Sequence, residues 1–217
     1  MNGRDLTLGL VGALAAGAAL GRRGSRARWR GQTSGPVHSV AYHFGRSASL
    51  RPGFGRGIHW GTEWSALDRW STTGKPPGQL VTAQIQLDRP LWTGEVCQWL
   101  DPGCVLWNLT DDLGVMRRLA EDGGVRWRDD FDLEEAREAL DRLDETLNTK
   151  TAPISREAAW NAVWNELERQ GYDGVAYENN TEDAGSTSYI TFRPSQVRVL
   201  RTQPVEAGVG WATRSPR

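Results

Sequence analysis

The sequence contains few of the residues from which metal centres and disulfide frameworks are built. Cys97 and Cys104 are its two cysteines, and it has three histidines among 217 residues. No cysteine or histidine pair has the spacing of a zinc site, and two thiols are too few for a disulfide framework. We therefore expect no metal site and two reduced, buried thiols, with a single disulfide as the alternative for an exported protein.

A hydrophobic run long enough to cross a bilayer is also missing from the N-terminal region. Residues 6–20 are apolar and uncharged, but a membrane-spanning helix needs roughly 20 such residues. Small residues recur at every fourth position over residues 9–21, so a helix here has one smooth face. We predict a small-residue apolar helix at residues 1–21, which is a packing or oligomerisation helix, a membrane-associated segment or a signal-peptide core.

Lysine is scarce, since 24 of the 26 basic side chains are arginine, and the charges are unevenly distributed. Residues 1–60 carry nine arginines and one acid, whereas the remainder carries 17 basic and 26 acidic side chains. A basic arm on an acidic body can contact nucleic acid or an anionic membrane. Residues 22–36 are therefore predicted to be a basic flexible linker. It is either simply solvated or part of a membrane or nucleic-acid contact made through residues 1–35.

The composition of the whole chain suits one soluble domain with a tail. With 38% hydrophobic and 24% charged residues, the chain holds enough apolar mass for a core. We place this domain at residues 37–200 and a disordered tail at residues 201–217.

Hydrophobic periodicity and capping residues predict a mixed order of strands and helices. Asp132, with Glu135 in a capping box, and Ser155 are expected to begin two helices, and Gly171 to end the second. Residues 88–130 show no regular pattern. The other expected elements are strands at 37–44, 81–87, 175–177, 188–192 and 197–200, a helix at 63–70 and a polar loop at 178–186. This order predicts an α+β fold and not a wound βαβ sheet, and the Rossmann glycine fingerprint is absent.

Three segments carry a resemblance to a known family. Residues 42–46 read Tyr-His-Phe-Gly-Arg, residues 57–62 read Gly-Ile-His-Trp-Gly-Thr and lead into the helix to Trp70, and the third segment is residues 171–197. Its central part, residues 178–186, reads Glu-Asn-Asn-Thr-Glu-Asp-Ala-Gly-Ser. Together the three segments resemble the ADP-ribosyltransferase-like domains of phage and mobile-element polyvalent proteins. Those domains are distant relatives of the diphtheria-toxin and poly(ADP-ribose) polymerase group. The resemblance covers about residues 37–200 and implies split antiparallel sheets with flanking helices and NAD bound in the cleft between them.

The resemblance assigns NAD-binding roles residue by residue. It implies that His43 holds the nicotinamide-side ribose, and that Phe44 and Gly45 stand near the family's glycine, whose backbone meets the carboxamide. His59 stands at the position of one ring-stacking tyrosine and Trp70 at that of the second. The complete set that it assigns to the cofactor is His43, Phe44, Gly45, His59, Trp60, Thr62, Trp70 and Tyr189.

The catalytic carboxylate is assigned through the third segment. Cleavage of the nicotinamide–ribose bond passes through an oxocarbenium-like state, which a nearby carboxylate stabilises. In the polymerases a glutamate directly precedes the final strand, and this chain has Ser188 there. Glu182 matches the acid of the Asn-x-x-Glu-Asp-x-Gly-Ser pattern of the polyvalent-protein domains. The resemblance therefore places Glu182 and Ser188 at the reacting centre, with Glu182 facing the sugar.

Two functions follow from these assignments. The first is a toxin-like, NAD-dependent mono-ADP-ribosyltransferase, or an NAD glycohydrolase if water is the acceptor, in a bacterial host cytoplasm or a phage particle. Its acceptor would be a host protein or nucleic acid. The alternative is a catalytically inactive module of the same fold that acts as a binding or virion-associated structural protein. Ser188 in place of glutamate and Phe44 in place of glycine favour the alternative.

Overall fold

The computed structural model describes residues 35–45, 50, 55–71, 77–127 and 131–205, without the side chains of residues 68–71. The predicted helix at 1–21 and most of the predicted linker at 22–36 lie outside the described residues, as do residues 206–217. Within the described residues, no helix combines the length and the apolar character that crossing a membrane requires.

The first sheet has three antiparallel strands. Strands β1 (Val37–Gly45), β3 (Gly78–Leu87) and β7 (Val197–Val205) lie in the order β1-β3-β7. Side chains alternate between the two faces of a strand, and one face of this sheet is apolar. Its buried members are Val37, Ala41, Val81, Ala83, Ile85 and Leu87. His43 continues this row on β1, because it is two residues beyond Ala41.

The second sheet has four strands, and its order brings the end of the chain beside an early strand. Strands β2 (Ile58–Trp60), β6 (Ser186–Thr191), β5 (Gly174–Asn179) and β4 (Pro90–Thr93) lie in the order β2-β6-β5-β4. The β4–β5 pair is parallel, and the other two pairs are antiparallel. Trp60 therefore lies opposite Tyr189, and the segment after β2 lies beside the start of β6.

Among the described residues, one isolated β-bridge connects the two sheets. Tyr42 of β1 and Gly61, which directly follows β2, exchange two backbone hydrogen bonds of 2.9 and 3.0 Å. This bridge brings together the second halves of β1 and β2, which carry the first two segments of the family resemblance.

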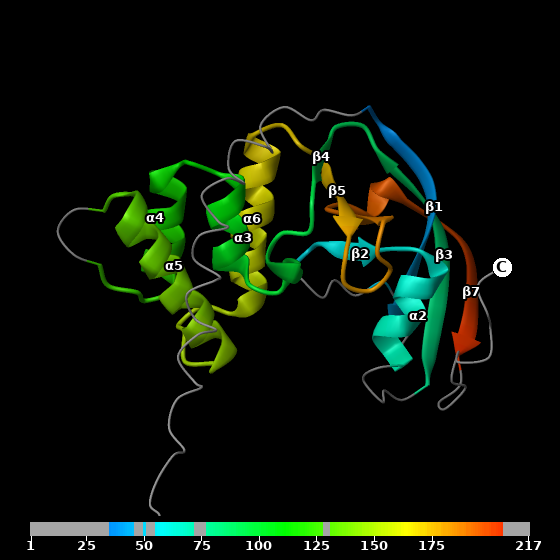
Figure 1. Ribbon diagram of the computed structural model, residues 1–217, viewed down its shortest axis with the longest axis horizontal. Coiled ribbons are helices and arrows are strands. Elements are labelled where there is room, and N and C mark those ends of the chain that lie inside the picture. The colour runs from blue at the N-terminus through cyan, green and yellow to red at the C-terminus, as the bar shows by residue number, and fades with distance from the viewer. Residues whose placement is uncertain (1–34, 46–49, 51–54, 72–76, 128–130, 206–217) are drawn as a thin grey trace, which may run out of the picture. The chain divides into compact units, whose positions relative to one another are not determined.

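The helices fall into two groups (Figure 1). Helix α2 (Glu63–Ser71) follows β2 and packs near β1. The others gather on one face of the second sheet and are α3 (Pro102–Leu109), α4 (Leu113–Asp122), α5 (Leu133–Asn148) and α6 (Arg156–Arg169). Two short turns, η2 (Cys97–Trp99) and η3 (Pro194–Gln196), complete the element order. The apolar core of this region joins helix residues such as Leu140 and Trp164 to Val175 and Ile190 of the sheet.

The predicted α+β class, with two mostly antiparallel sheets and flanking helices, is confirmed. The predicted helix starts are also confirmed. The Asp132 side chain accepts from the Glu134 and Glu135 amides, and the Ser155 side chain accepts from the Ala158 amide. The Glu135 carboxylate does not complete the expected pattern by reaching back, since it accepts a hydrogen bond from Arg142 at 2.8 Å.

Three expectations were wrong. Residues 88–130 are not irregular, because they contain β4, η2, α3 and α4. Strand β7 continues to Val205, past the expected domain end at residue 200, since its pairing with β3 extends to Gly78. The two cysteines are joined in a disulfide and are not reduced thiols.

Candidate functional site

His43 is oriented by the backbone of the neighbouring strand. Its Nδ1 lies 2.9 Å from the carbonyl oxygen of His59. A carbonyl oxygen can only accept, so Nδ1 carries the proton, and Nε2 of the neutral ring is then an acceptor. The His43 ring also lies 5.6 Å from the Trp60 ring, tilted by 55°. His43 therefore has a defined ring orientation and tautomer.

Trp60 belongs to the core between the two sheets. It is 1% exposed, and its Nε1 donates a 3.0 Å hydrogen bond to Thr191 Oγ1. Tyr189, opposite Trp60 on β6, is partly buried against the same apolar cluster. The Trp60 ring thus contacts His43 at a tilt, while its indole N–H is satisfied within the sheet.

The His59 ring lies on the other side of β2 from Trp60. It contacts Tyr177 at a ring-centroid distance of 6.1 Å and Trp99 at 6.4 Å, and its Nε2 is buried. Tyr177 and Trp99 belong to the core on the helical side of the second sheet. The two histidines assigned to NAD are therefore linked through the His59 carbonyl, but their rings pack against different aromatic groups.

Asn179 brings the two predicted catalytic residues together. Its side chain is 1% exposed, and its Nδ2 donates 3.1 Å hydrogen bonds to Glu182 Oε2 and to Ser188 Oγ. Its Oδ1 accepts from the backbone amides of Thr181 and Glu182 at 3.1 and 2.9 Å. This one amide thus folds the turn after β5 and sets the Glu182 carboxylate near the Ser188 hydroxyl.

The turn is also tied to the start of α2. Thr62 Oγ1 donates a 2.5 Å hydrogen bond to Asp183 Oδ2 and accepts from the Ser65 amide at 3.1 Å. Gly61 lies directly under these groups, because a Cβ there would approach Ser65 Oγ to 2.1 Å and Ser188 Oγ to 3.3 Å. The close packing of Ser65 on Gly61 therefore leaves no room for a side chain at that position.

Glu95 anchors the outer part of the same turn. Its carboxylate accepts from Thr181 Oγ1 at 2.8 Å and from the Asn180 amide at 3.2 Å. Sequence reasoning did not single out Glu95, which is 86 residues from Thr181. It also missed the roles of Asn179 and Asp183, although both belong to the Asn-x-x-Glu-Asp pattern. A side chain that bonds backbone amides two and three residues later is a frequent property of asparagine in turns.

The remaining predicted residues lie apart from the turn. The Phe44 ring covers Gly78 of β3, since a Cβ on Gly78 would come within 2.3 Å of it. By strand alternation Phe44 faces away from His43. Gly45 ends β1 opposite Gln79. Trp70 lies in α2 as expected, but its side chain is outside the described residues.

The turn after β5 offers carboxylates and hydroxyl groups, which can bind a ligand by hydrogen bonds and stabilise positive charge. Glu182, Asp183 and Glu95 are brought together by one turn, beside two hydroxyl side chains, Thr62 and Ser188. Among the residues that the structure describes, no group of three or more His, Cys, Asp or Glu side chains is arranged to hold a metal ion.

Comparison with known proteins gives one weak similarity. No family model and no curated protein sequence matches the chain. In structure it is similar to a chain of the M. tuberculosis MbcT–MbcA toxin–antitoxin complex, with 13% sequence identity and a TM-score of 0.38. The similarity covers 85% of this chain and 93% of that one. A likeness of this size carries no information about activity.

Proposed function

We propose that the domain binds NAD and cleaves the bond between its nicotinamide and ribose, passing the ADP-ribose to an acceptor. The observation that carries this proposal is the pair of hydrogen bonds from Asn179 to Glu182 and Ser188. They hold a carboxylate and a hydroxyl side by side next to Gly61, at the bridge between the two sheets. The resemblance had assigned these two residues to the reacting centre from positions that are not adjacent in sequence.

The donor and acceptor groups fit a nicotinamide riboside. His43 is fixed with Nδ1 as the donor to the His59 carbonyl, so Nε2 is the ring atom that accepts from a ribose hydroxyl. The Ser188 hydroxyl both donates and accepts.

Glu182 supplies the negative charge that the reaction needs. As the C1′–N bond breaks, its electron pair goes to the nicotinamide nitrogen, and positive charge develops on the ribose. A fixed carboxylate lowers the energy of that state without reorganisation. The acceptor then forms a bond to C1′ and gives up a proton. With water as the acceptor the products are ADP-ribose and nicotinamide, and with a host protein or nucleic acid they are a modified macromolecule and nicotinamide.

Nicotinamide release from NAD by the full chain tests this proposal. We expect release by the wild type, and losses of at least about a hundredfold in Glu182→Gln and His43→Ala, the usual scale for removing a charge-stabilising group. Glu178→Gln is the matched control, because Glu178 is an exposed carboxylate on β5, four residues before Glu182. It should leave the rate unchanged.

The same assay separates the enzyme from a binding module. If the wild type releases nothing alone, the assay is repeated in host lysate with NAD labelled in its ADP-ribose part. Binding of NAD by calorimetry with no label transfer and no release would contradict the enzymatic proposal and support an inactive NAD-binding module. Equal rates in the wild type and in Glu182→Gln would remove Glu182 from the reacting centre.

A further inference from the structure

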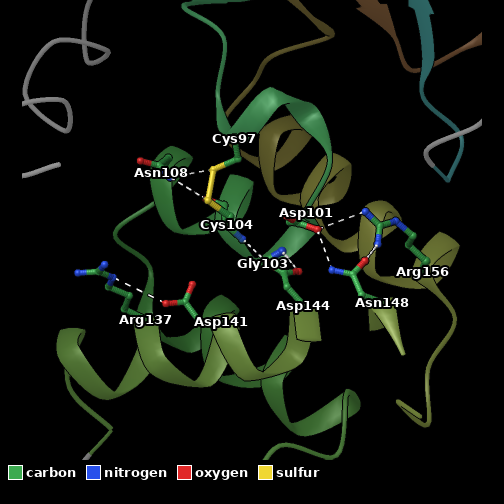
Figure 2. The surroundings of a disulfide bond; sticks show 10 residues. All are labelled: Cys97, Asp101, Gly103, Cys104, Asn108, Arg137, Asp141, Asp144, Asn148 and Arg156. Atoms are coloured by element: carbon green, nitrogen blue, oxygen red, sulfur yellow. Dashed lines mark hydrogen bonds and ion pairs between the residues drawn. A yellow bond between two sulfur atoms is a disulfide. The ribbon is translucent and has the colours of Figure 1, made fainter. Parts of the chain in front are cut away.

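The disulfide between Cys97 and Cys104 joins turn η2 to helix α3 (Figure 2). Its α3 end is firmly held. The buried Asp144 of α5 accepts hydrogen bonds from the Gly103 and Cys104 amides at 2.9 and 2.8 Å, and Asn108 donates to the Cys104 carbonyl at 2.8 Å. The bond therefore ties the less regular turn η2 to a fixed point.

Turn η2 has a backbone conformation that its residues do not favour. Cys97, Gln98 and Trp99 have φ angles of +48°, +50° and +53°, and none of them is glycine. Each such residue raises the free energy, because Cβ crowds the carbonyl oxygen in the left-handed region. Trp99 adds a second penalty, since its Nε1 is buried and has no hydrogen-bond partner. Without the disulfide, a change of conformation in this turn would therefore lower its free energy.

Trp99 is the residue through which the turn reaches the candidate site. It is 1% exposed and stacks on Trp164 at 6.2 Å and 27°. Its ring lies 5.3 Å from that of Tyr177, and its edge-on contact with His59 helps to bury the His59 ring. Trp99 meets the half-buried His59 ring edge-on and Tyr177 meets it at a tilt, so these two rings occupy part of the space around it.

We propose that the Cys97–Cys104 disulfide is a redox latch that keeps Trp99 against the His59 ring and so restricts access to the NAD site on that side. The role of NAD rests on the function proposed above, whereas the latch itself rests on η2. A dithiol reductant opens it. One thiolate of the reductant attacks a disulfide sulfur, which releases one cysteine and forms a mixed disulfide. The reductant's second thiolate then attacks the mixed disulfide and releases the other cysteine, so that two electrons and two protons pass to the protein. The reductant becomes a cyclic disulfide.

Reduction should open the latch because turn η2 is strained, whereas helix α3 on the other side of the disulfide is held independently. Once it is broken, η2 is no longer tied to α3, and its three residues can return to right-handed φ angles. The Trp99 indole can then leave its place and find water for its Nε1. The helix side does not depend on the bond, because Asp144 still holds the α3 N-terminus. Reduction therefore exposes His59 while the domain stays folded.

Hydrogen exchange of the full chain tests the latch without NAD. The Trp99 and Leu100 amides donate to Val96 and Cys97 carbonyls at 2.8 and 3.0 Å in η2. After reduction we expect about tenfold or faster exchange in a peptide covering residues 97–101, and faster exchange around residue 59, with α6 unchanged. The double variant Cys97→Ser/Cys104→Ser is the matched control and should show the open pattern with or without reductant. Two free thiols in the untreated protein, or identical exchange in both redox states, would overturn the latch.

NAD binding and nicotinamide release, measured in the same two states, test what the latch controls. We expect tighter binding and faster release after reduction, and no reductant effect in the double serine variant. Equal or weaker binding after opening would overturn control of the site by Trp99. An opening seen by hydrogen exchange, with NAD neither bound nor cleaved in either state, would support the latch and count against the proposed function instead.

Discussion

The Asn179 side chain donates a 3.1 Å hydrogen bond to the Ser188 hydroxyl across the β5–β6 pair. Both groups are buried, at 1% and 2% exposure, so water does not replace this bond if it is lost. Because the same nitrogen also donates to Glu182, the geometry of the proposed reacting centre depends on a residue that need not touch the substrate.

Replacing Asn179 should therefore affect both stability and activity. In Asn179→Ala the Thr181 and Glu182 amides lose their acceptor and Ser188 loses its donor. We expect the free energy of unfolding to fall by about 2–3 kcal/mol, and nicotinamide release to fall with it. Urea denaturation and the release assay measure the two effects.

Asn179→Asp separates the two roles of this side chain. A carboxylate still accepts from the two turn amides but cannot donate to Glu182 or Ser188. We expect the turn to remain, as seen from protection of those amides in hydrogen exchange, while nicotinamide release falls as far as in the alanine variant. Full release by Asn179→Asp would show that the donor bonds do not matter for the reaction.

Thr62 offers a second test of the turn, from the α2 side. Thr62→Val keeps the size of the side chain but removes the hydroxyl that donates to Asp183 and accepts from the Ser65 amide. Since one of these bonds involves a carboxylate, we expect a loss of about 2 kcal/mol in unfolding free energy. Thr62→Ser retains the hydroxyl and is the control. A valine variant as stable as the serine variant would contradict the role given to the Thr62–Asp183 bond.

Local signals predicted the parts of the fold that depend on neighbours in sequence. Asp132 and Ser155 cap their helices through amides two or three residues away, and the alternation in β3 is visible in the sequence. Helix α3 is different, because it begins with Pro102 and Gly103 and is capped by Asp144, which is 41 residues from Gly103. A cap supplied from another helix leaves no pattern in the segment that it stabilises.

The candidate site was predictable to a similar extent. The resemblance selected Glu182 and Ser188, and in the structure both accept a hydrogen bond from the Asn179 side chain. The same resemblance put His43 and His59 around one ligand, although their rings meet different aromatic partners. Trp99 could not have been found this way, since its position depends on a left-handed turn without glycine. The disulfide was only the alternative to reduced thiols, because two cysteines have no framework to indicate pairing.

Trp60 should behave as a core residue with one buried hydrogen bond. Trp60→Phe removes the donor to Thr191 Oγ1 and leaves that hydroxyl, which is fully buried, without its partner. We expect a loss of about 1–3 kcal/mol in unfolding free energy. Thr191→Val likewise leaves the buried Trp60 indole N–H without its acceptor. The double variant should be more stable than the sum of the two single losses predicts, because it removes both partners. Additive losses would mean that this hydrogen bond contributes little.

Asp144 should make stability depend on pH in the helical part of the domain. Burial raises its pKa from 3.8 to about 6, although the Gly103 and Cys104 amides oppose the shift by favouring the carboxylate. The folded state thus binds the proton more tightly than the unfolded state does. This contribution to stability is fully present below pH 3.8 and is lost as pH rises through about 6. A shift of about two units corresponds to about 3 kcal/mol.

Comparison with Asp144→Asn isolates this effect, because the amide does not titrate and the other ionisable groups are common to both proteins. Between pH 4 and pH 7 we expect the unfolding free energy of the wild type to fall by up to about 3 kcal/mol relative to the variant. Urea denaturation at several pH values measures the difference. The variant loses one acceptor for the α3 amides, so its stability differs from the wild type at any single pH, and the slope of the difference is the informative quantity. A difference that stays flat over this range would mean that Asp144 titrates alike in the folded and unfolded chains. A difference of the opposite sign would mean that the two amide hydrogen bonds outweigh burial and hold the group as a carboxylate.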